Sequence, residues 1–237
     1  MPDDRICGLN AVSALFACRV EDVNRLYYAD SAKVAAGPLC AELARLHRPY
    51  RLLPPDELER AAGTGHHGGI VALATPRPLP MIDFVRPPRH PLLLVLDGVG
   101  NPHNLGAIAR SAAFFGVKAM LLHETPLQAM PSDAAYRVAE GGLEHLEVYR
   151  TRNLRKALLA LDPAYRTVAA TLTPDAVPVQ SLPRDRPVAL VLGNEERGIG
   201  FEALETCRRR IRINAHGPVQ SLNVAQAAAI LIHELTH

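Results

Sequence analysis

The chain has 237 residues, of which 48% are hydrophobic and 21% are charged, and its formal net charge is +2. This composition is typical of a soluble globular protein, and the length suits one large or two small domains. The near-neutral charge excludes a strongly basic field over the whole molecule, so any nucleic-acid surface must be local.

The first block of the chain alternates helical and strand patterns, which predicts a small α/β domain over residues 1–75. His66 and His67 lie in a glycine-rich loop that a strand follows, so the loop is not a phosphate cradle, and adjacent histidines suit a solvated loop better than a zinc site. The predicted helices cover residues 6–18, 31–47 and 55–62, and the predicted strands cover 25–28, 50–53 and 70–74.

Residues 76–91 contain six prolines and mark the best domain boundary in the chain. This predicted stiff linker is basic, through Arg77, Arg86, Arg89 and His90. Such a segment either lies along a phosphate backbone or remains a solvated connection.

Residues 92–237 alternate apolar strands with helices, which predicts a mainly parallel sheet. The last helix is apolar almost all the way round, as expected for a buried helix or a subunit interface. We expect Ser221 to cap it. The predicted strands cover residues 92–96, 119–122, 147–149, 167–170, 188–192 and 208–213, and the predicted helices cover 105–115, 131–139, 153–161, 201–206 and 221–235.

Arg110 is the one charged residue inside the predicted helix that follows the strand 92–96. It lies well off the apolar stripe of that helix, and Gly106, one turn earlier, predicts an open surface beside it. A polar loop after a parallel strand, followed by such a helix, is where open α/β folds bind ligands.

Three polar loops follow predicted strands, over residues 97–104, 193–200 and 214–221. They contain no nucleophile–base pair, no Walker loop and no dinucleotide fingerprint, which argues against hydrolysis and hydride transfer. The remaining polar side chains suit a polar, nucleoside-like molecule and the positioning of a phosphate. They are Asn104, Arg110, Glu195, Ser221 and Asn223.

Three segments resemble the motifs of the SpoU (TrmH-like) branch of the SPOUT RNA methyltransferases, in the family's order and spacing. They are DGVGNPHNLGAIARSAAFFGV, VALVLGNEERGIG and IRINAHGPVQSLNVAQAAAILIHEL. The resemblance covers residues 92–237 strongly. Residues 5–75 resemble more weakly the small substrate-binding domain found in front of this domain in several members.

The resemblance implies an α/β fold with a mostly parallel sheet and a C-terminal deep trefoil knot, preceded by a small α/β RNA substrate-binding domain. It also implies S-adenosyl-L-methionine as cofactor, no metal, a homodimer, and methyl transfer to a ribose 2′-hydroxyl of tRNA or rRNA. By motif, the implied catalytic residues are Arg110, Asn104, Glu195, Ser221 and Asn223, and the implied cofactor-binding residues are Leu192, Gly193, Ile213, Ser221 and Leu222.

The family pattern gives Arg110 the role of activating the hydroxyl, but a guanidinium with a pKa above ~12 is an unusual base. Holding the target phosphate suits its chemistry better. The structural alternatives are an exposed helix arginine for Arg110, a dipole-stabilised carboxylate for Glu195 and a plain cap for Ser221. Many members have Pro-Met where this chain has Asn214-Ala215, which alters the inner surface of the cofactor loop.

Several features stay outside this core prediction. The segment 140–145 also looks family-like, but the sequence assigns it no role. Two arginine-rich groups are candidates for an RNA track or for solvated faces. They are Arg150, Arg152, Arg155 and Lys156, and Arg208, Arg210 and Arg212.

The four cysteines show no metal spacing, so we expect reduced, buried thiols in a cytoplasmic protein. We expect no signal peptide, because the start is acidic and lacks an apolar run, and we expect no membrane span, because no apolar run is long enough. The alternatives to the enzyme are a catalytically silent RNA-binding protein that keeps the knotted fold, and a nucleotide-binding α/β enzyme without RNA.

Overall fold

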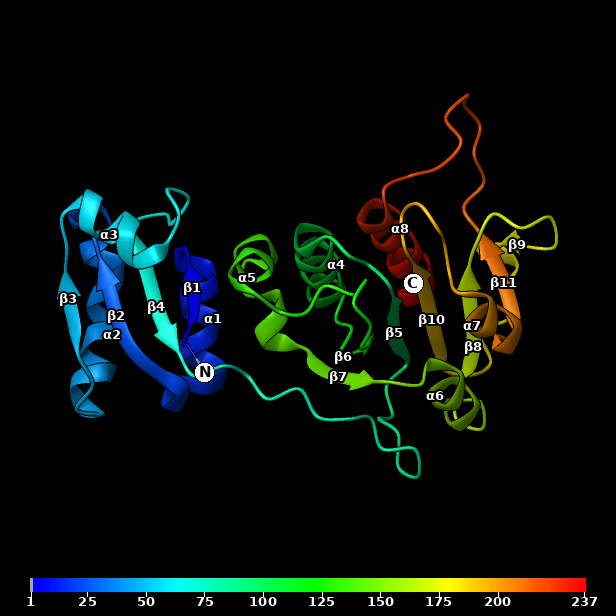
Figure 1. Ribbon diagram of the computed structural model, residues 1–237, viewed down its shortest axis with the longest axis horizontal. Helices are drawn as coiled ribbons and strands as arrows, with labels where there is room; N and C mark the ends of the chain where they lie inside the picture. Colours follow the sequence, from blue (N-terminus) through cyan, green and yellow to red (C-terminus); the bar gives the residue numbers. More distant parts are fainter. Residues whose placement is uncertain (1) are drawn as a thin grey trace.

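The computed structural model describes residues 2–237 as two α/β units that lie side by side (Figure 1). The first unit contains a four-stranded sheet in the order β1-β4-β2-β3. Helices α1 and α2 pack on one face of this sheet, and α3 packs on the other. Its strands are β1 (Asp4–Cys7), β2 (Val23–Tyr28), β3 (Tyr50–Leu52) and β4 (Ile70–Ala74), and its helices are α1 (Leu9–Arg19), α2 (Lys33–Arg45) and α3 (Pro55–Ala62).

The start of the chain differs from the prediction. The predicted helix over residues 6–18 begins later, because residues up to Cys7 form strand β1, which pairs antiparallel with β4. Gly8, with φ +92°, then turns the chain into α1. An apolar start such as Ile6-Cys7 fits a strand as well as a helix, and only the pairing partner decides between them. The other predicted elements of this unit are confirmed.

The second unit contains a seven-stranded sheet in the order β7-β6-β5-β10-β8-β11-β9, in which every pairing is parallel. The predicted mainly parallel sheet is therefore confirmed. Its strands are β5 (Leu92–Asp97), β6 (Ala119–His123), β7 (Glu147–Thr151), β8 (Arg166–Ala170), β9 (Val177–Pro178), β10 (Val188–Gly193) and β11 (Arg209–Arg212). Its helices are α4 (Pro102–Phe114), α5 (Asp133–Ala139), α6 (Leu154–Leu161), α7 (Phe201–Thr206) and α8 (Val224–Thr236).

Successive residues of the central strands pack into two different helix layers. In β5, Leu94 and Leu96 face the layer of α4, α5 and α8, whereas Leu93 and Val95 face α6 and α7. All four side chains are fully buried. Burial of one such side chain contributes about 1.5–3 kcal/mol, so continuous apolar runs fix this sheet between its helices.

Two helices, α4 and α8, begin three residues away from their predicted starts. Helix α4 starts at Pro102 rather than Leu105, because the Asn101 side chain accepts a hydrogen bond from His103 N at 2.8 Å and proline fits the first turn. Helix α8 starts after Asn223, whose side chain accepts from Ala225 N at 2.8 Å. The predicted capping role of Ser221 is therefore wrong.

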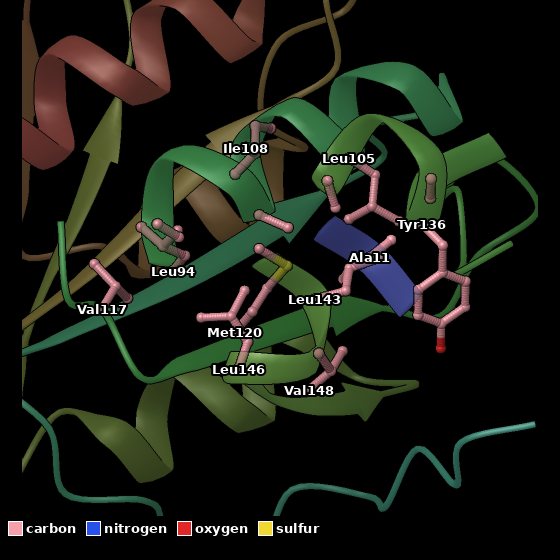
Figure 2. Close-up of a cluster of buried hydrophobic side chains, with 14 of the residues drawn as sticks. Ala11, Leu94, Leu105, Ile108, Val117, Met120, Tyr136, Leu143, Leu146 and Val148 are labelled. Atoms are coloured by element: carbon pink, nitrogen blue, oxygen red, sulfur yellow. The ribbon is translucent and has the colours of Figure 1, made fainter. Parts of the chain in front are cut away.

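The two units share a continuous core rather than a loose tether. Figure 2 shows Ala11 of α1 beside Tyr136 and Leu143 of the second unit, within one hydrophobic cluster. The guanidinium of Arg19 donates two hydrogen bonds, at 2.8 and 2.9 Å, to Glu144, whose side chain is 1% exposed. Removing one partner of such a buried pair is strongly destabilising.

Residues between the two sheets are docked on the second unit. Arg77 donates to the carbonyl oxygens of Leu143 and Leu146, at 2.6 and 2.5 Å. Ile82 is buried, and its amide donates to the carbonyl oxygen of Arg150 on β7 at 2.9 Å. Across residues 2–237 no helix has the length and apolar character needed to cross a bilayer.

Candidate active site

The site lies where β5 and β10 end side by side. Gly193 is in register with Asp97, so the loops that follow these strands leave the sheet together. Asp97 Oδ2 accepts a hydrogen bond from Gly200 N at 2.8 Å, and its other oxygen lies 2.7 Å from His123 Nδ1. Asn194 Nδ2 donates to the carbonyl oxygen of Gly98 at 2.8 Å. These bonds tie the first and second predicted loops to each other.

The side chain of Gln128 holds the backbone of the loop over residues 97–104 in place. This buried side chain accepts hydrogen bonds from the amides of Gly98 and Val99, at 3.0 and 3.1 Å, and donates to Val99 O and Ala129 O. Buried backbone groups need such partners, because an unsatisfied one costs about 1–3 kcal/mol. Gln128 is not among the predicted site residues, because no motif or spacing marks it.

Three of the five predicted catalytic residues form one hydrogen-bonded chain. Asn223 Nδ2 donates to Asn104 Oδ1 at 3.1 Å, and Asn104 Nδ2 donates to Glu195 Oε1. The three residues come from three different parts of the chain. Asn104 lies in the first turn of α4, Glu195 in the loop after β10, and Asn223 directly before α8. The arrangement gives a row of amide and carboxylate groups that can orient a polar ligand such as a ribose.

A cavity of about 820 Å³ opens between the loop after β10 and the loop before α8. Its volume falls in the range of about 300–1,000 Å³ that suits small molecules and cofactors. Its lining combines apolar side chains, such as Leu192 and Leu231, with polar ones, such as Glu195 and Asn214, which suits a ligand with an apolar ring system and polar groups. All five predicted cofactor-binding residues line it: Leu192, Gly193, Ile213, Ser221 and Leu222.

Gly193 is required by the fold of the loop itself. A Cβ atom there would overlap the backbone of Gly198 and Ile199, because the loop turns back onto the end of β10. Mutual hydrogen bonds between the backbones of Asn194 and Gly198 close this turn, at 3.0 and 2.9 Å. Asn194 Oδ1 also accepts from the amides at positions 196 and 197. The turn presents Glu195 to Asn104.

Ser221 belongs to the loop that carries the residues differing from the family pattern. The loop between β11 and α8, drawn in orange in Figure 1, extends beyond the carboxyl edge of the sheet. Asn214, Ala215 and Ser221 are exposed and line the cavity. Ser221 therefore lies at the predicted cofactor site.

Arg110 lies apart from this hydrogen-bonded chain. Its guanidinium forms an ion pair with Glu140 at 2.9 Å, its side chain is 57% exposed, and it is not in the cavity lining. The open surface predicted beside it is wrong, because helix α5 packs directly on Gly106. A Cβ there would lie 2.5 Å from the Ala135 carbonyl oxygen. Glycine at this position permits close helix packing.

Most candidate arginines of the RNA track are paired within the chain. Arg208 forms an ion pair with Asp162 at 2.7 Å, and hydrogen bonds from this guanidinium hold the pKa of the Asp162 carboxyl below its usual value. Arg150 and Arg152 both contact Glu124. Arg210 also pairs with carboxylates, and Arg212 donates to a backbone carbonyl. These contacts favour structural roles for the group.

The four thiols are free. Burial raises the pKa of Cys7 to about 11 and that of Cys207 to about 12. The expectation of buried thiols is confirmed for Cys7 and Cys40, but Cys207 is half-buried and Cys18 is exposed on α1. Within residues 2–237 no group of three or more His, Cys, Asp or Glu side chains is placed to hold a metal ion.

Known proteins are similar to this chain in sequence and in fold. Residues 91–233 match the SpoU rRNA Methylase family, and residues 5–80 match the RNA 2'-O ribose methyltransferase substrate binding family. The chain is 31% identical over 234 residues to the uncharacterized tRNA/rRNA methyltransferase YfiF of Escherichia coli O157:H7, with coverage of 98% of this chain and 67% of that protein.

A second relative is the 23S rRNA (guanosine-2'-O-)-methyltransferase RlmB of Photobacterium profundum, 30% identical over 239 residues, with coverage of 99% and 97%. The crystal structure of the AdoMet-bound rRNA methyltransferase from Sinorhizobium meliloti has a TM-score of 0.81 at 22% identity, over 99% of this chain and 87% of that one. This structural likeness establishes the fold.

The fold and the site define an α/β protein with a small-molecule cavity at the carboxyl edge of a parallel sheet. The chain belongs to the SpoU rRNA methylase family, a family of S-adenosylmethionine-dependent tRNA and rRNA methyltransferases. The family resemblance of the three motifs is thereby confirmed, as is S-adenosylmethionine as the cofactor of the family.

Proposed function

We propose that the protein transfers a methyl group from S-adenosylmethionine to a ribose 2′-hydroxyl of tRNA or rRNA. The observation that carries this proposal is the hydrogen-bonded chain of Asn223, Asn104 and Glu195 next to the cavity that the predicted cofactor residues line. The relatives named as 2′-O-methyltransferases support the same reaction.

In this proposal the cavity holds the cofactor and the polar row holds the ribose. Leu192, Ile213 and Leu222 supply apolar walls for the adenosyl group, while Gly193 and Ser221 supply backbone and hydroxyl contacts. The bound cofactor supplies an electrophilic methyl group on a sulfonium. The protein contributes alignment, which can be worth about 7–11 kcal/mol of the barrier when reacting groups are well oriented.

Arg110 completes the proposed site as the phosphate-binding residue. Its guanidinium carries five N–H donors, and the ion pair with Glu140 occupies one side of it. The remaining donors suit bidentate contact with the phosphate beside the target ribose. Fixing the phosphate limits the directions from which the 2′-oxygen can approach the methyl group.

We also propose that the active form is a homodimer. Phe114 at the end of α4 is 82% exposed, and Ile230 on the neighbouring α8 is partly exposed. An apolar surface formed by two packed helices fits a second copy of the chain.

The family resemblance further supports a trefoil knot in the C-terminal segment and a division into residues 1–75, 76–91 and 92–237. The proposed location is the cytoplasm, where free thiols persist.

Two measurements test the function. Calorimetry with S-adenosylmethionine should show saturable binding, and its absence at millimolar cofactor would contradict the enzyme. Purified protein with labelled cofactor should then methylate unmodified tRNA or rRNA. A 2′-O-methyl group blocks alkaline cleavage at the modified nucleotide, so an alkali-resistant bond distinguishes ribose from base methylation. A chain that binds RNA without any transfer would favour the catalytically silent alternative.

A further inference from the structure

The turn that follows α5 has an unusual backbone. Glu140 has φ +44° and Gly141 has φ +92°, so two successive residues adopt the left-handed region. Glutamate rarely adopts this conformation, and such conformations persist only where the surrounding contacts enforce them. This turn is the family-like segment to which the sequence assigned no role.

The turn is wedged between a helix of each unit. A Cβ on Gly141 would lie 2.7 Å from the Ala14 Cβ of α1, and one on Gly142 would lie 2.8 Å from the Arg110 Cα of α4. Both distances are too short for any side chain. The backbone of this turn therefore touches the first unit on one side and the helix of Arg110 on the other.

Glu140 bridges the same two helices with its side chain. Its Oε1 pairs with Arg110 Nη1 at 2.9 Å, and its Oε2 accepts a hydrogen bond from Asn10 Nδ2 at 3.2 Å. One carboxylate thus joins the amino-terminal turn of α1 to the guanidinium of the proposed phosphate ligand. Arg110 and Glu140 are 57% and 42% exposed, so their attraction is weak, and orientation is the larger effect.

We propose that Glu140 is a positioning residue for Arg110, and that Asn10 makes this positioning depend on the docked first unit. The inference rests on the proposed function, in which Arg110 holds the substrate phosphate. A free arginine side chain loses rotamer entropy when a ligand orders it. The ion pair with Glu140 already restricts the Arg110 side chain before RNA binds, so less entropy is lost on binding.

The test compares Glu140→Gln, Glu140→Asp, Asn10→Ala and Arg5→Ala in the full chain. Glu140→Gln removes the charge at nearly constant shape, and Glu140→Asp retains the charge. Arg5→Ala is the matched control, because the pair of Arg5 with Asp133 at 3.5 Å crosses the same junction without touching Arg110. Melting temperatures confirm that each variant is folded.

The first readout is methyl transfer at saturating cofactor. We expect Glu140→Gln to lower kcat by about five- to twenty-fold, with less than about a twofold change in cofactor Kd. Glu140→Asp should recover part of the loss, and Asn10→Ala should lower kcat by a smaller factor in the same direction. Arg5→Ala should match the wild type. An equal loss in Arg5→Ala would mean that docking alone matters, and the proposal would fail.

The second readout does not need catalysis. Phenylglyoxal modifies free arginines, and mass spectrometry measures its rate at Arg110. We expect faster modification of Arg110 in Glu140→Gln than in the wild type or in Arg5→Ala. Equal rates would overturn the positioning role. If the wild type transfers no methyl group, the proposed function fails, whereas this labelling comparison still decides whether Glu140 constrains Arg110.

Discussion

Asn223 and Asn104 lie 119 positions apart in the sequence, and Asn223 Nδ2 donates a hydrogen bond to Asn104 Oδ1 at 3.1 Å. The other side-chain atom of Asn223, Oδ1, accepts from Ala225 N and caps α8. One amide therefore serves the helix with its oxygen and the site with its nitrogen. Only asparagine combines these two functions in so short a side chain.

Asn223→Asp separates the two roles of this amide. Aspartate is as good a cap as asparagine, so the free energy of unfolding should change little, whereas the lost N–H donor should lower methyl transfer by about tenfold. Asn223→Ala should lower both transfer and stability, the latter by about 1 kcal/mol. Urea unfolding and transfer assays on the same samples measure the two effects. Full activity in Asn223→Asp would show that the hydrogen bond from Asn223 to Asn104 is not needed for methyl transfer.

Arg110→Ala should abolish methyl transfer, by about 100-fold or more, and leave cofactor binding intact, because Arg110 is not in the cavity lining. Arg110→Lys keeps the charge but loses the planar fork, so it should recover only a minor part of the rate. Calorimetry and initial rates check both statements. Activity that survives in Arg110→Ala would leave Arg110 as an exposed helix arginine.

The sequence predicts which loops carry the polar residues of the candidate site, but not how those loops lie relative to one another. Continuous apolar runs such as 188–192 identify buried strands, and the loops after them carry the polar residues. Parallel strands bring their carboxyl ends to one edge, and there Asn104 meets Glu195. That β10 lies next to β5 is a property of the strand order, which no local pattern contains.

Residues whose roles depend on tertiary neighbours escaped the prediction. Gly106 indicated an open surface by spacing alone, but the backbone of α5 occupies the space. Gln128 satisfies two amides of a loop about thirty residues away, and Glu140 meets Arg110 across a turn between helices. Such contacts are set by packing between elements and leave no periodic signal in the sequence.

Phe114→Asp should convert a dimer into a monomer. Burying a phenylalanine contributes about 1.5–3 kcal/mol, and a charge at its place opposes association. Val34→Asp is the matched control, because Val34 is 93% exposed on α2 of the first unit and lies away from α4 and α8. Sedimentation velocity should show a dimer for the wild type and for the control. A monomeric wild type would refute the proposed assembly.

Gly193→Ala should disrupt the turn over residues 194–198. The added methyl group overlaps the backbone of Gly198, and backbone cannot move aside as a flexible side chain does. We expect a loss of stability of about 1–3 kcal/mol and a large loss of cofactor affinity. Gly37→Ala is the control, because its Cβ meets no atom within 4 Å and the residue lies inside α2. That variant should be more stable than the wild type by about 0.5–1 kcal/mol.

The pair of Asp162 with Arg208 predicts a pH dependence of stability with a definite sign. Hydrogen bonds from Arg208 lower the pKa of Asp162 in the folded state, so the unfolded chain binds the proton more readily. The stabilisation is therefore complete above the ordinary aspartate pKa of about 3.9 and disappears as the pH falls through the lower folded-state value.

Asp162→Asn should be less stable than the wild type at pH 6, and the difference should shrink below about pH 4. Urea unfolding between these pH values measures it, and Arg208→Ala should show the same trend. A difference that stays constant with pH would assign the loss to packing and not to the ion pair.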